Sequence, residues 1–309
     1  MSKPAAPAAG SGPDVAARIG RLAGTGVREV RRIGGQHRWG HYRVVLAGGQ
    51  LAFAKVASST AAGSDASQEL GAVFEAEARG LRWLAEAAAV PVPDVLGWDA
   101  AGLAVSWVPG SAPDAASAER FGRDLARLHL AGSARYGAPW PGFIASLPLR
   151  NGAGTTGESW PRWYASQRLL PYVRRARDAG ELDRDDVRLL EQVASRAAAL
   201  AGPAEPPSRI HGDCWSGNLL WSGGRGWLID PAAHGGHRET DLAMLALFGA
   251  PYLDRILAAY QEAAPLAAGW QARVPLHQLH PLLVHVCLFG GGYRDATLAA
   301  ARSALAAAT

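Results

Sequence analysis

Lysine and asparagine are nearly absent from this chain of 309 residues. Only two of its 31 basic residues are lysines, Lys3 and Lys55, and the others are arginines. Asparagine occurs only at Asn151 and Asn218. Such a bias is expected of a GC-rich genome, which drifts away from lysine and asparagine codons. We therefore interpret the few lysine and asparagine side chains that remain as chemically required.

Cysteine, long apolar runs and clustered charge are also scarce. The two cysteines, Cys214 and Cys287, cannot form a disulfide framework, so we expect the reducing cytoplasm. No apolar run approaches the ~18 residues of a membrane-spanning helix, and we expect no membrane partner. The formal net charge is +4 with the basic residues spread along the chain, which does not indicate a nucleic-acid binder. We expect a monomer, although the sequence does not fix the oligomeric state.

Apolar residues make up 49% of the chain and charged residues 19%, which is enough apolar material for a sizeable core. The length fits one large domain or two lobes that share a core. Residues 1–14 are rich in alanine, proline and glycine and contain no apolar stretch. We expect them to form a flexible tail and not a signal peptide.

The first half of the chain has the pattern of short strands around one helix. We predict strands at residues 27–33, 41–46, 51–57, 95–98 and 103–108. Residues 68–89 carry apolar side chains with a period of 3.6, which predicts the helix. We therefore place a strand-rich N-terminal lobe at residues 15–107.

The second half is mostly helical. We predict helices at residues 115–131, 160–178, 183–201, 239–248, 252–264, 276–288 and 295–308. Two short apolar runs on either side of residues 222–226 predict a hairpin. Residues 137–160 form a Pro/Gly-rich segment that is too long for a passive connection. A larger helical lobe thus covers residues 108–309.

Three polar residues follow a spacing that is typical of phosphoryl-transfer enzymes. Asp213 and Asn218 are five positions apart, and Asp230 follows the predicted hairpin. In such enzymes one aspartate accepts the proton of the attacking hydroxyl group, while the asparagine and the second aspartate hold Mg²⁺. An isolated Asp/Asn pair more often caps a turn, but three such residues across a hairpin favour catalysis.

Lys55 and Glu77 are the predicted cationic pair of this chemistry. Lys55 lies within an apolar strand. If its only role were to present a positive charge to water, arginine would serve, and this chain uses arginine at nearly all its other basic positions. Glu77 falls in the middle of the apolar stripe of the predicted helix, where a carboxylate needs a cationic partner. Glu75 lies on the opposite face and is interpreted as a solvated charge. A Lys–Glu pair directs the lysine toward the α- and β-phosphates in kinases.

Two further features are weaker candidates. Asp241 opens an apolar helix, where the helix dipole favours a negative charge, and it can also accept hydrogen bonds from the backbone of residues 211–218. Gly34 and Gly35 lie between two predicted strands, where they can form a turn over phosphate groups.

Other chemistries are less well supported. A serine hydrolase is not indicated because the G-x-S-x-G motif is absent. Cys214 lies beside the predicted base, but nothing near it in the sequence marks a thiolate nucleophile. Some histidine pairs have spacings that zinc ligands can have, although histidines on apolar helices more often fill a core: His234 with His237, and His277 with His280.

Taken together, these motifs resemble the fructosamine kinase (ketosamine-3-kinase) family of the protein-kinase-like and aminoglycoside-phosphotransferase-like superfamily. The resemblance rests on H-G-D-C-W-S-G-N at residues 211–218, on G-H-R-E-T-D-L-A-M at 236–244 and on L-F-G-G-G-Y at 288–293. It implies an α+β fold with a small N-terminal lobe, built from a five-stranded antiparallel sheet and one main helix, and a larger, mostly helical C-terminal lobe.

The resemblance also implies a function. Members of the family use ATP to phosphorylate the 3-hydroxyl of fructosamine- or ribulosamine-type adducts, and the product then decomposes and frees the amine. ATP and Mg²⁺ or Mn²⁺ are the implied cofactors. The implied site residues are the base Asp213, the metal ligands Asn218 and Asp230, the ATP-binding residues Lys55, Glu77, Ser106, Trp107, Gly34 and Gly35, the loop-supporting residues His211 and Asp241, and the substrate-side residues Trp215, His237, Arg238 and Glu239.

The sequence departs from the family pattern outside these catalytic positions. Cys214 replaces the usual leucine, residues 233–235 replace aromatic positions, and Ser106 stands where glutamate is common. A kinase for another hydroxylated amine, such as an aminoglycoside or choline, is therefore the main alternative. A catalytically dead kinase-like binding protein is the other, but it would usually lack one of the five kinase residues. The preferred sugar, and the choice of free or protein-bound substrate, stay open.

Overall fold

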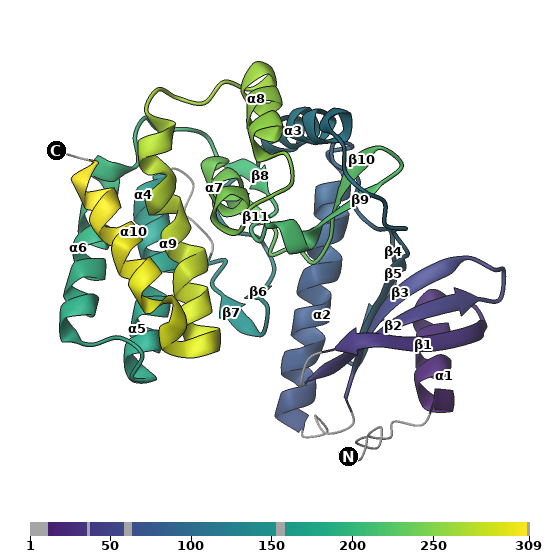
Figure 1. The fold of residues 1–309 in the computed structure, drawn as a ribbon. Coiled ribbons are helices and arrows are strands. Elements are labelled where there is room, and N and C mark those ends of the chain that lie inside the picture. The colour runs from purple at the N-terminus through teal and green to yellow at the C-terminus, as the bar shows by residue number, and fades with distance from the viewer. Residues whose placement is uncertain (1–11, 36–37, 59–63, 153–157, 308–309) are drawn as a thin grey trace, which may run out of the picture. The chain divides into compact units, whose positions relative to one another are not determined.

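The computed structural model describes residues 12–35, 38–58, 64–152 and 158–307. Among these, the chain divides into two compact units (Figure 1). The first unit extends to Ala78 and adds Pro93–Val108, and the second contains Arg79–Val92 and the residues from Pro109 onward. Residues 79–92, which the sequence assigned to the N-terminal lobe, thus belong to the second unit.

The first unit contains a five-stranded antiparallel sheet, as predicted. Its strands are β1 (Val27–Gly35), β2 (Trp39–Leu46), β3 (Leu51–Ala57), β4 (Val95–Asp99) and β5 (Gly102–Ser106). The order across the sheet is β1-β2-β3-β5-β4. The central strand β3 places Lys55 opposite His41 of β2 and Leu103 of β5. Lys55 therefore lies in the middle of the sheet.

Helix α1 (Gly12–Ala23) packs against this sheet and was not predicted. Ile19 and Leu22 are buried in a core with apolar residues of β2, β3 and β5. These two residues are three apart, which places them on one face of a helix. The predicted tail is therefore too long, because residues 12–14 form the first turn of α1, and residues 1–11 lie outside the described part of the chain.

Helix α2 (Ser64–Ala85) begins and ends four residues before the predicted bounds. Its last turn stops early because Ala88 adopts the left-handed conformation, with φ of 48°, which a helix cannot continue through. The predicted apolar stripe is buried, and Glu77 lies on the same buried side.

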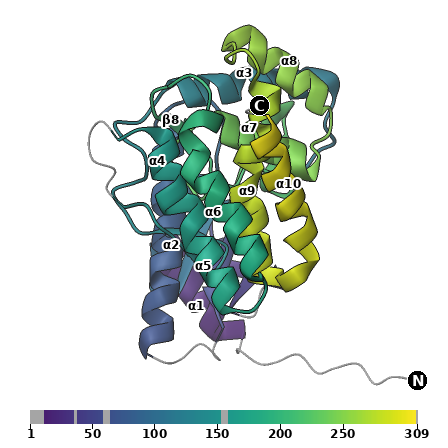
Figure 2. The ribbon, with the colours of Figure 1, turned by 90° about the vertical axis from the view of Figure 1, so that its left-hand side faces the viewer.

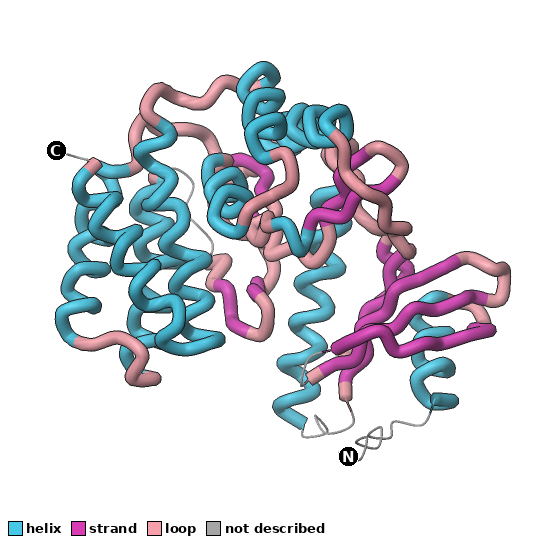
Figure 3. Tube along the Cα trace, viewed as in Figure 1, coloured by secondary structure: helices cyan, strands magenta, loops and turns pink. Residues whose placement is uncertain are grey.

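Helices dominate the second unit, as Figure 3 shows by colour. They are α3 (Ala115–Leu130), α4 (Trp160–Tyr164), the π-helix η2 (Ala165–Leu169), α5 (Leu170–Asp178), α6 (Arg184–Leu200), α7 (Glu239–Phe248), α8 (Leu253–Ala263), α9 (Trp270–Phe289), the 3-10 turn η4 (Gly290–Tyr293) and α10 (Arg294–Ala306). Helices α5, α6, α9 and α10 lie side by side in Figures 1 and 2 around one apolar core. None of the described helices is long and apolar enough to cross a membrane.

Short strands connect these helices. The predicted hairpin is β9 (Leu219–Ser222) with β10 (Arg225–Leu228). Two further pairs were not predicted, β6 (Gly142–Ile144) with β7 (Leu147–Leu149), and β8 (Ser208–Ile210) with β11 (His234–Gly236). Residues 211–218 run from the end of β8 through the 3-10 turn η3 (Ser216–Asn218) into β9. Because residues 211–218 contain the predicted base Asp213, we call them the catalytic loop below.

Asn151, one of the two asparagines, has a structural contact. Its Oδ1 accepts a hydrogen bond of 3.0 Å from Nη2 of Arg168. Arg168 is 1% exposed and lies over the ring of Trp163, 4.3 Å from its centroid. Burial lowers the pKa of Arg168 to about 9. Asn151 thus helps to solvate a buried guanidinium group.

Candidate active site

The backbone at the start of the catalytic loop is held by Asp241 of helix α7. Its two carboxylate oxygens accept hydrogen bonds from the backbone N–H groups of His211, at 2.7 Å, and of Gly212, at 2.9 Å. Gly212 has φ of 79°, and an added Cβ would lie 2.4 Å from the carbonyl oxygen of Ala232. The loop can therefore make this turn only with glycine at position 212.

Asp241 is held in turn by His129 of helix α3. Its Oδ2 lies 3.2 Å from Nε2 of His129, whose Nδ1 lies 2.8 Å from the hydroxyl of Tyr260. Asp241 is fully buried. Burial disfavours its carboxylate, but the hydrogen bond with His129 and those from the loop backbone outweigh this effect, and the pKa of Asp241 lies below its ordinary value. Sequence reasoning missed His129, since a histidine on an amphipathic helix resembles a core filler.

His211 connects the loop to the segment that carries Asp230. Its Nε2 lies 3.0 Å from the carbonyl oxygen of Ile229, and its Nδ1 accepts from the backbone N–H of Asp213 at 3.3 Å. Since a carbonyl only accepts, the proton of the neutral ring sits on Nε2. Burial lowers the pKa of His211, so the ring stays neutral near pH 7. His211 therefore positions both segments.

The structure brings Asp213, Asn218 and Asp230 together. Nδ2 of Asn218 lies 2.8 Å from Oδ2 of Asp213, 3.0 Å from the carbonyl oxygen of Asp213 and 3.5 Å from that of Asp230. The backbone N–H of Ile229 donates to the carbonyl oxygen of Asn218 at 3.0 Å. Asp230 adopts the left-handed conformation, with φ of 53°. Strained backbone of this kind is concentrated at functional sites.

This group fits a hard cation. Because Nδ2 of Asn218 donates to Asp213, the amide atom left to bind a cation is Oδ1. The amide oxygen of Asn218 and a carboxylate such as that of Asp230 are the kinds of oxygen ligand that Mg²⁺ prefers. Cys214, beside Asp213, is fully buried, and burial raises the pKa of its thiol well above the ordinary value. A neutral, buried thiol is neither a nucleophile nor a metal ligand at neutral pH.

The first unit contains the Lys55–Glu77 ion pair. Nζ of Lys55 lies 2.7 Å from Oε2 of Glu77, and the two residues are 5% and 7% exposed. A buried pair of this kind costs desolvation energy. Apolar residues at these two positions would stabilise the fold as well or better. We therefore interpret the pair as a means of fixing the direction of the ammonium group.

The other predicted ATP-binding residues lie at edges of the first unit. Gly34 and Gly35 end β1, where they face His41 and Gly40 of β2, and residues 36 and 37 of the predicted turn lie outside the described part of the chain. Ser106 ends β5, and its hydroxyl accepts from the backbone N–H of Asp94 at 2.8 Å.

Trp107 follows Ser106 directly, and its backbone N–H donates to the carbonyl oxygen of Leu51 at 3.2 Å. Ser106 and Trp107 precede Val108, where the first unit ends.

Trp215 lies on the catalytic loop, two residues after Asp213. Its side chain is 38% exposed. The ring covers Gly217, where an added Cβ would lie 2.3 Å from it. Glycine at position 217 therefore leaves room for the indole of Trp215.

The other three substrate-side candidates lie close to charged groups of the second unit. Arg238 binds Glu205 with two hydrogen bonds of 2.7 Å. Glu239 binds Arg273 through both of its oxygens, at 2.9 and 2.5 Å. His237 is 4% exposed, and its Nε2 lies 3.9 Å from Oε2 of Glu205. The charges on Arg238 and Glu239 are thus already balanced within the chain.

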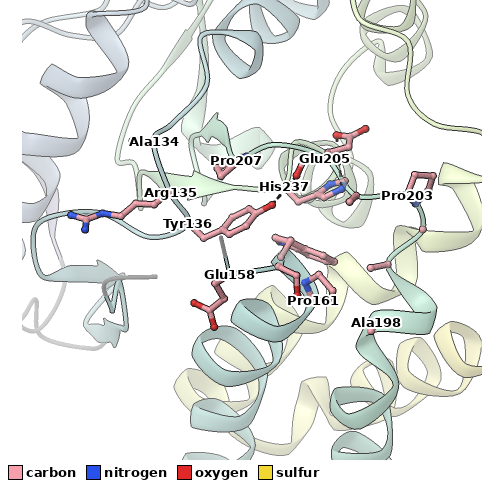
Figure 4. Close-up of a pocket in the computed structure, with 15 residues that line it drawn as sticks. Ala134, Arg135, Tyr136, Glu158, Pro161, Ala198, Pro203, Glu205, Pro207 and His237 are labelled. Atoms are coloured by element: carbon pink, nitrogen blue, oxygen red, sulfur yellow. Dashed lines mark hydrogen bonds and ion pairs between the residues drawn. The ribbon is translucent and has the colours of Figure 1, made fainter. Parts of the chain in front are cut away.

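His237 also lines a pocket of about 540 Å³ in the second unit (Figure 4). The rings of Tyr136 and Trp160 and several prolines form its walls. None of its lining residues belongs to the catalytic loop, and Asp230 is not among them. This pocket and the Asp213 group therefore have no residue in common.

Of the zinc candidates, only one group of side chains comes together among the described residues. His237, Glu239 and His277 place ligand atoms within 4.8 Å of one another. Arg273 already occupies both oxygens of Glu239, however, and a guanidinium group repels a metal ion. The pKa of Glu239 is lowered to about 2, because its contacts with His277 and Arg273 outweigh the effect of burial. These residues fit an ion-pair network better than a zinc site.

Comparisons with known proteins identify relatives of this chain. A protein of Klebsiella aerogenes named as a ketoamine kinase is 32% identical over 229 residues, which is 72% of this chain and 78% of that protein. One from Thermus thermophilus with the same designation is 34% identical over 227 residues, or 72% and 79% of the two chains. A crystal structure from Thermobifida fusca, described as a fructosamine-3-kinase, is 54% identical with a TM-score of 0.88 and covers 94% of this chain and 98% of its own.

More distant structures share the fold alone. A macrolide 2'-phosphotransferase of Brachybacterium faecium is 18% identical, with a TM-score of 0.58 over 93% of this chain and 95% of that one. The sequence profile of the fructosamine kinase family matches residues 34–307. That match includes every predicted site residue, and the chain therefore belongs to the fructosamine kinase family.

Proposed function

We propose that this chain is an ATP-dependent kinase that transfers the γ-phosphoryl group of ATP to the 3-hydroxyl of a fructosamine- or ribulosamine-type ketosamine. The observation that carries the proposal is the hydrogen bond from Asn218 to the carboxylate of Asp213. Both residues lie on the loop whose first backbone N–H groups donate to Asp241. Family membership makes the chain a phosphotransferase that uses ATP and a small-molecule substrate. The relatives named as ketoamine kinases support the ketosamine as acceptor.

Asp213 acts as the general base in this proposal. Its carboxylate accepts the proton of the 3-hydroxyl as that oxygen attacks the γ-phosphorus. The hydrogen bond from Asn218 fixes the rotation of the carboxylate. His211 donates to the carbonyl oxygen of Ile229 and accepts from the backbone N–H of Asp213. These two bonds keep the base at a fixed position relative to the segment that carries Asp230.

Asn218 and Asp230 would hold Mg²⁺. The ion neutralises charge on the phosphate oxygens when it is bound. Lys55, directed by Glu77, is the proposed phosphate-binding cation of the first unit. Loss of phosphate from the 3-phosphorylated product would release the amine, and we propose protein deglycation as the outcome.

The direct test measures ATP consumption by the purified chain with ribulosyl-lysine, fructosyl-lysine and an aminoglycoside in parallel. We expect turnover with one or both ketosamines and none with the aminoglycoside. Phosphorus NMR of the product then locates the new ester, which we expect on the 3-oxygen. Turnover restricted to the aminoglycoside, or an ester at another carbon, would overturn the proposal. An Asp213→Asn preparation serves as the blank for contaminating ATPases.

A further inference from the structure

A row of aromatic rings runs from the catalytic loop over the second unit. Trp215 lies 5.8 Å from Phe248, which lies 4.9 Å from His285, and His285 lies 5.4 Å from Phe289, all between ring centroids. Tyr293 lies 4.7 Å from His285 and 6.1 Å from Phe289. We call these five residues the aromatic surface. It includes two residues of the family-like motif at 288–293, which the proposed chemistry does not use.

The aromatic surface is open to solvent. Phe289 is 66% exposed and Trp215 38% exposed, and both are among the most exposed large apolar side chains of the described residues. Phe248, His285 and Tyr293 are partly exposed. Single exposed apolar residues need no explanation, but a connected group indicates a binding surface.

The rings have fixed positions relative to Asp213. Helix α7 begins at Glu239 and ends at Phe248. Asp241, which holds the catalytic loop, lies in its first turn. The Nδ1–H of His285 donates to the carbonyl oxygen of Pro281 at 2.8 Å, which fixes that ring on α9. A rigid helix thus connects the base to the aromatic surface, which is the pre-organisation that binding requires.

The length of the surface exceeds what a sugar needs. A free ketosamine whose 3-hydroxyl meets Asp213 would reach Trp215, but three successive ring-to-ring steps of about 5 Å lead on to Phe289. A negative charge lies at the far end. The carboxylate of Glu181 adjoins Gly290, where an added Cβ would lie 3.1 Å from Oε2. No described residue forms an ion pair with Glu181.

We propose that the aromatic surface binds the polypeptide segment that flanks a ketosamine-bearing lysine, with Glu181 favouring a basic residue in that segment. This inference rests on the proposed function. Aromatic rings contact extended chains and the aliphatic and cationic parts of lysine and arginine side chains favourably. Exposed aromatic residues are also the commonest energetic centres of protein interfaces.

The test compares two substrates in Phe289→Ala. One is free ribulosyl-lysine, and the other is a short peptide with a single ribulosyl-lysine at its centre and an arginine nearby. We expect the ratio of kcat/KM for the peptide to kcat/KM for the free compound to fall about fivefold or more, because the variant loses an interface residue that only the peptide contacts. Tyr293→Ala should lower the same ratio.

Leu130→Ala is the matched control, since Leu130 is 64% exposed and ends α3. It should leave the ratio unchanged. Glu181→Gln should narrow the preference for an arginine-flanked over a glutamate-flanked peptide. Thermal unfolding of each variant verifies folding, and the high exposure of Phe289 makes a large loss of stability unexpected.

The outcomes separate the two proposals. If the wild-type protein phosphorylates neither substrate, the proposed function fails. If it phosphorylates both and Phe289→Ala leaves the ratio unchanged, the aromatic surface does not bind peptide and this inference is overturned. Sedimentation velocity adds one more outcome: a wild-type dimer that becomes monomeric in Phe289→Ala with an unchanged ratio would assign the surface to a second copy of the chain.

Discussion

At the scale of the residue, the amide of Asn218 contacts both the side chain and the backbone of Asp213. Oδ2 accepts from Nδ2 of Asn218, which also donates to the backbone carbonyl of Asp213. The amide therefore fixes both the side chain and the backbone of the proposed base. Because Nδ2 of the amide donates to Asp213, its Oδ1 is the atom that would bind Mg²⁺ in the proposed mechanism.

Asp213→Asn should preserve the fold and remove most turnover. A positioned general base contributes roughly 10²- to 10⁴-fold to the rate, and an amide cannot accept the proton. Steady-state kinetics with ATP and ribulosyl-lysine measure the loss, and the unfolding temperature serves as the control. A variant that keeps a large part of the wild-type kcat would show that Asp213 is not the base.

Lys55→Arg should impair activity although it keeps the charge. A planar guanidinium is larger than an ammonium and directs its N–H groups differently. The space beside Glu77 is defined by a contact of 2.7 Å, and Lys55 is 5% exposed. Glu77→Ala should act through the same pair, so the two losses in kcat/KM should be non-additive in a double-mutant cycle. Additive losses would mean that the two residues act independently.

At the scale of the element, helix α7 links the catalytic loop to the rest of the second unit. Asp241, in its first turn, holds the loop, and Glu239 at its start binds Arg273 of α9. The bounds of α7 were predicted as residues 239–248 and are confirmed. Its ion pairs could not be predicted, because sequence spacing does not show which charges of two distant helices meet.

Asp241→Asn should lower both the stability of the protein and its kcat. The asparagine offers one acceptor oxygen, and its NH₂ group would face one of the two backbone N–H donors of His211 and Gly212. An unsatisfied buried donor costs about 1–3 kcal/mol. We expect a lower free energy of unfolding in urea together with a lower kcat. Wild-type stability in the variant would show that the two hydrogen bonds contribute nothing.

His237 should make stability depend on pH. Burial, followed by the neighbouring His277, lowers its pKa from 6.5 to about 3. Between about pH 6.5 and pH 3, the unfolded chain therefore binds a proton at this site and the folded chain does not. The contribution of this site to the free energy of unfolding is highest above pH 6.5 and falls as the pH is lowered toward 3. Several other buried histidines act in the same direction.

We expect His237→Gln to reduce the acid slope of the unfolding free energy by about one proton, or ~1.4 kcal/mol per pH unit, between pH 6 and 4. Urea unfolding at a series of pH values gives both slopes. Identical slopes for the variant and the wild type would contradict the buried, neutral state of His237.

At the scale of the whole molecule, the sequence predicted the two-lobed kinase-like architecture well. The five strands and most helices follow from periodicity. The three-residue strands β6, β7, β8 and β11 were missed because three residues are too short to show a period of two. Helix α9 begins six residues before its predicted start, since Pro275 lies inside it and proline normally indicates a helix end.

The candidate site was predictable to the extent that its chemistry is local in sequence. Asp213, Asn218 and Asp230 were proposed from their spacing, and the structure places Asn218 within 3.5 Å of both aspartates. His129 was not, because it acts on the loop through Asp241, 112 positions away. Trp215 was proposed at the substrate side. The rest of the aromatic surface, from Phe248 to Phe289, could not be predicted because it depends on how α7 and α9 pack.

Turnover by the whole protein should require Mg²⁺ or Mn²⁺. Asp230→Asn should lose most activity, because an uncharged amide binds the cation more weakly than a carboxylate. Asparagine tolerates the left-handed conformation, so this variant avoids the strain that alanine would add at φ of 53°. Dialysis against a chelator followed by metal titration measures the dependence, and full activity of the chelated wild-type enzyme would refute it.

The burial of Lys55 has a consequence for the enzyme's own chemical ageing. Reducing sugars damage proteins by condensing with unprotonated amines, chiefly those of exposed lysines. The only lysine besides Lys3 lies in the sheet, 5% exposed and bonded as an ammonium to Glu77, so it offers no lone pair to a sugar carbonyl. Arginine supplies the remaining cations and is far less prone to form ketosamines. A kinase that acts on sugar-damaged amines would thus scarcely become its own substrate.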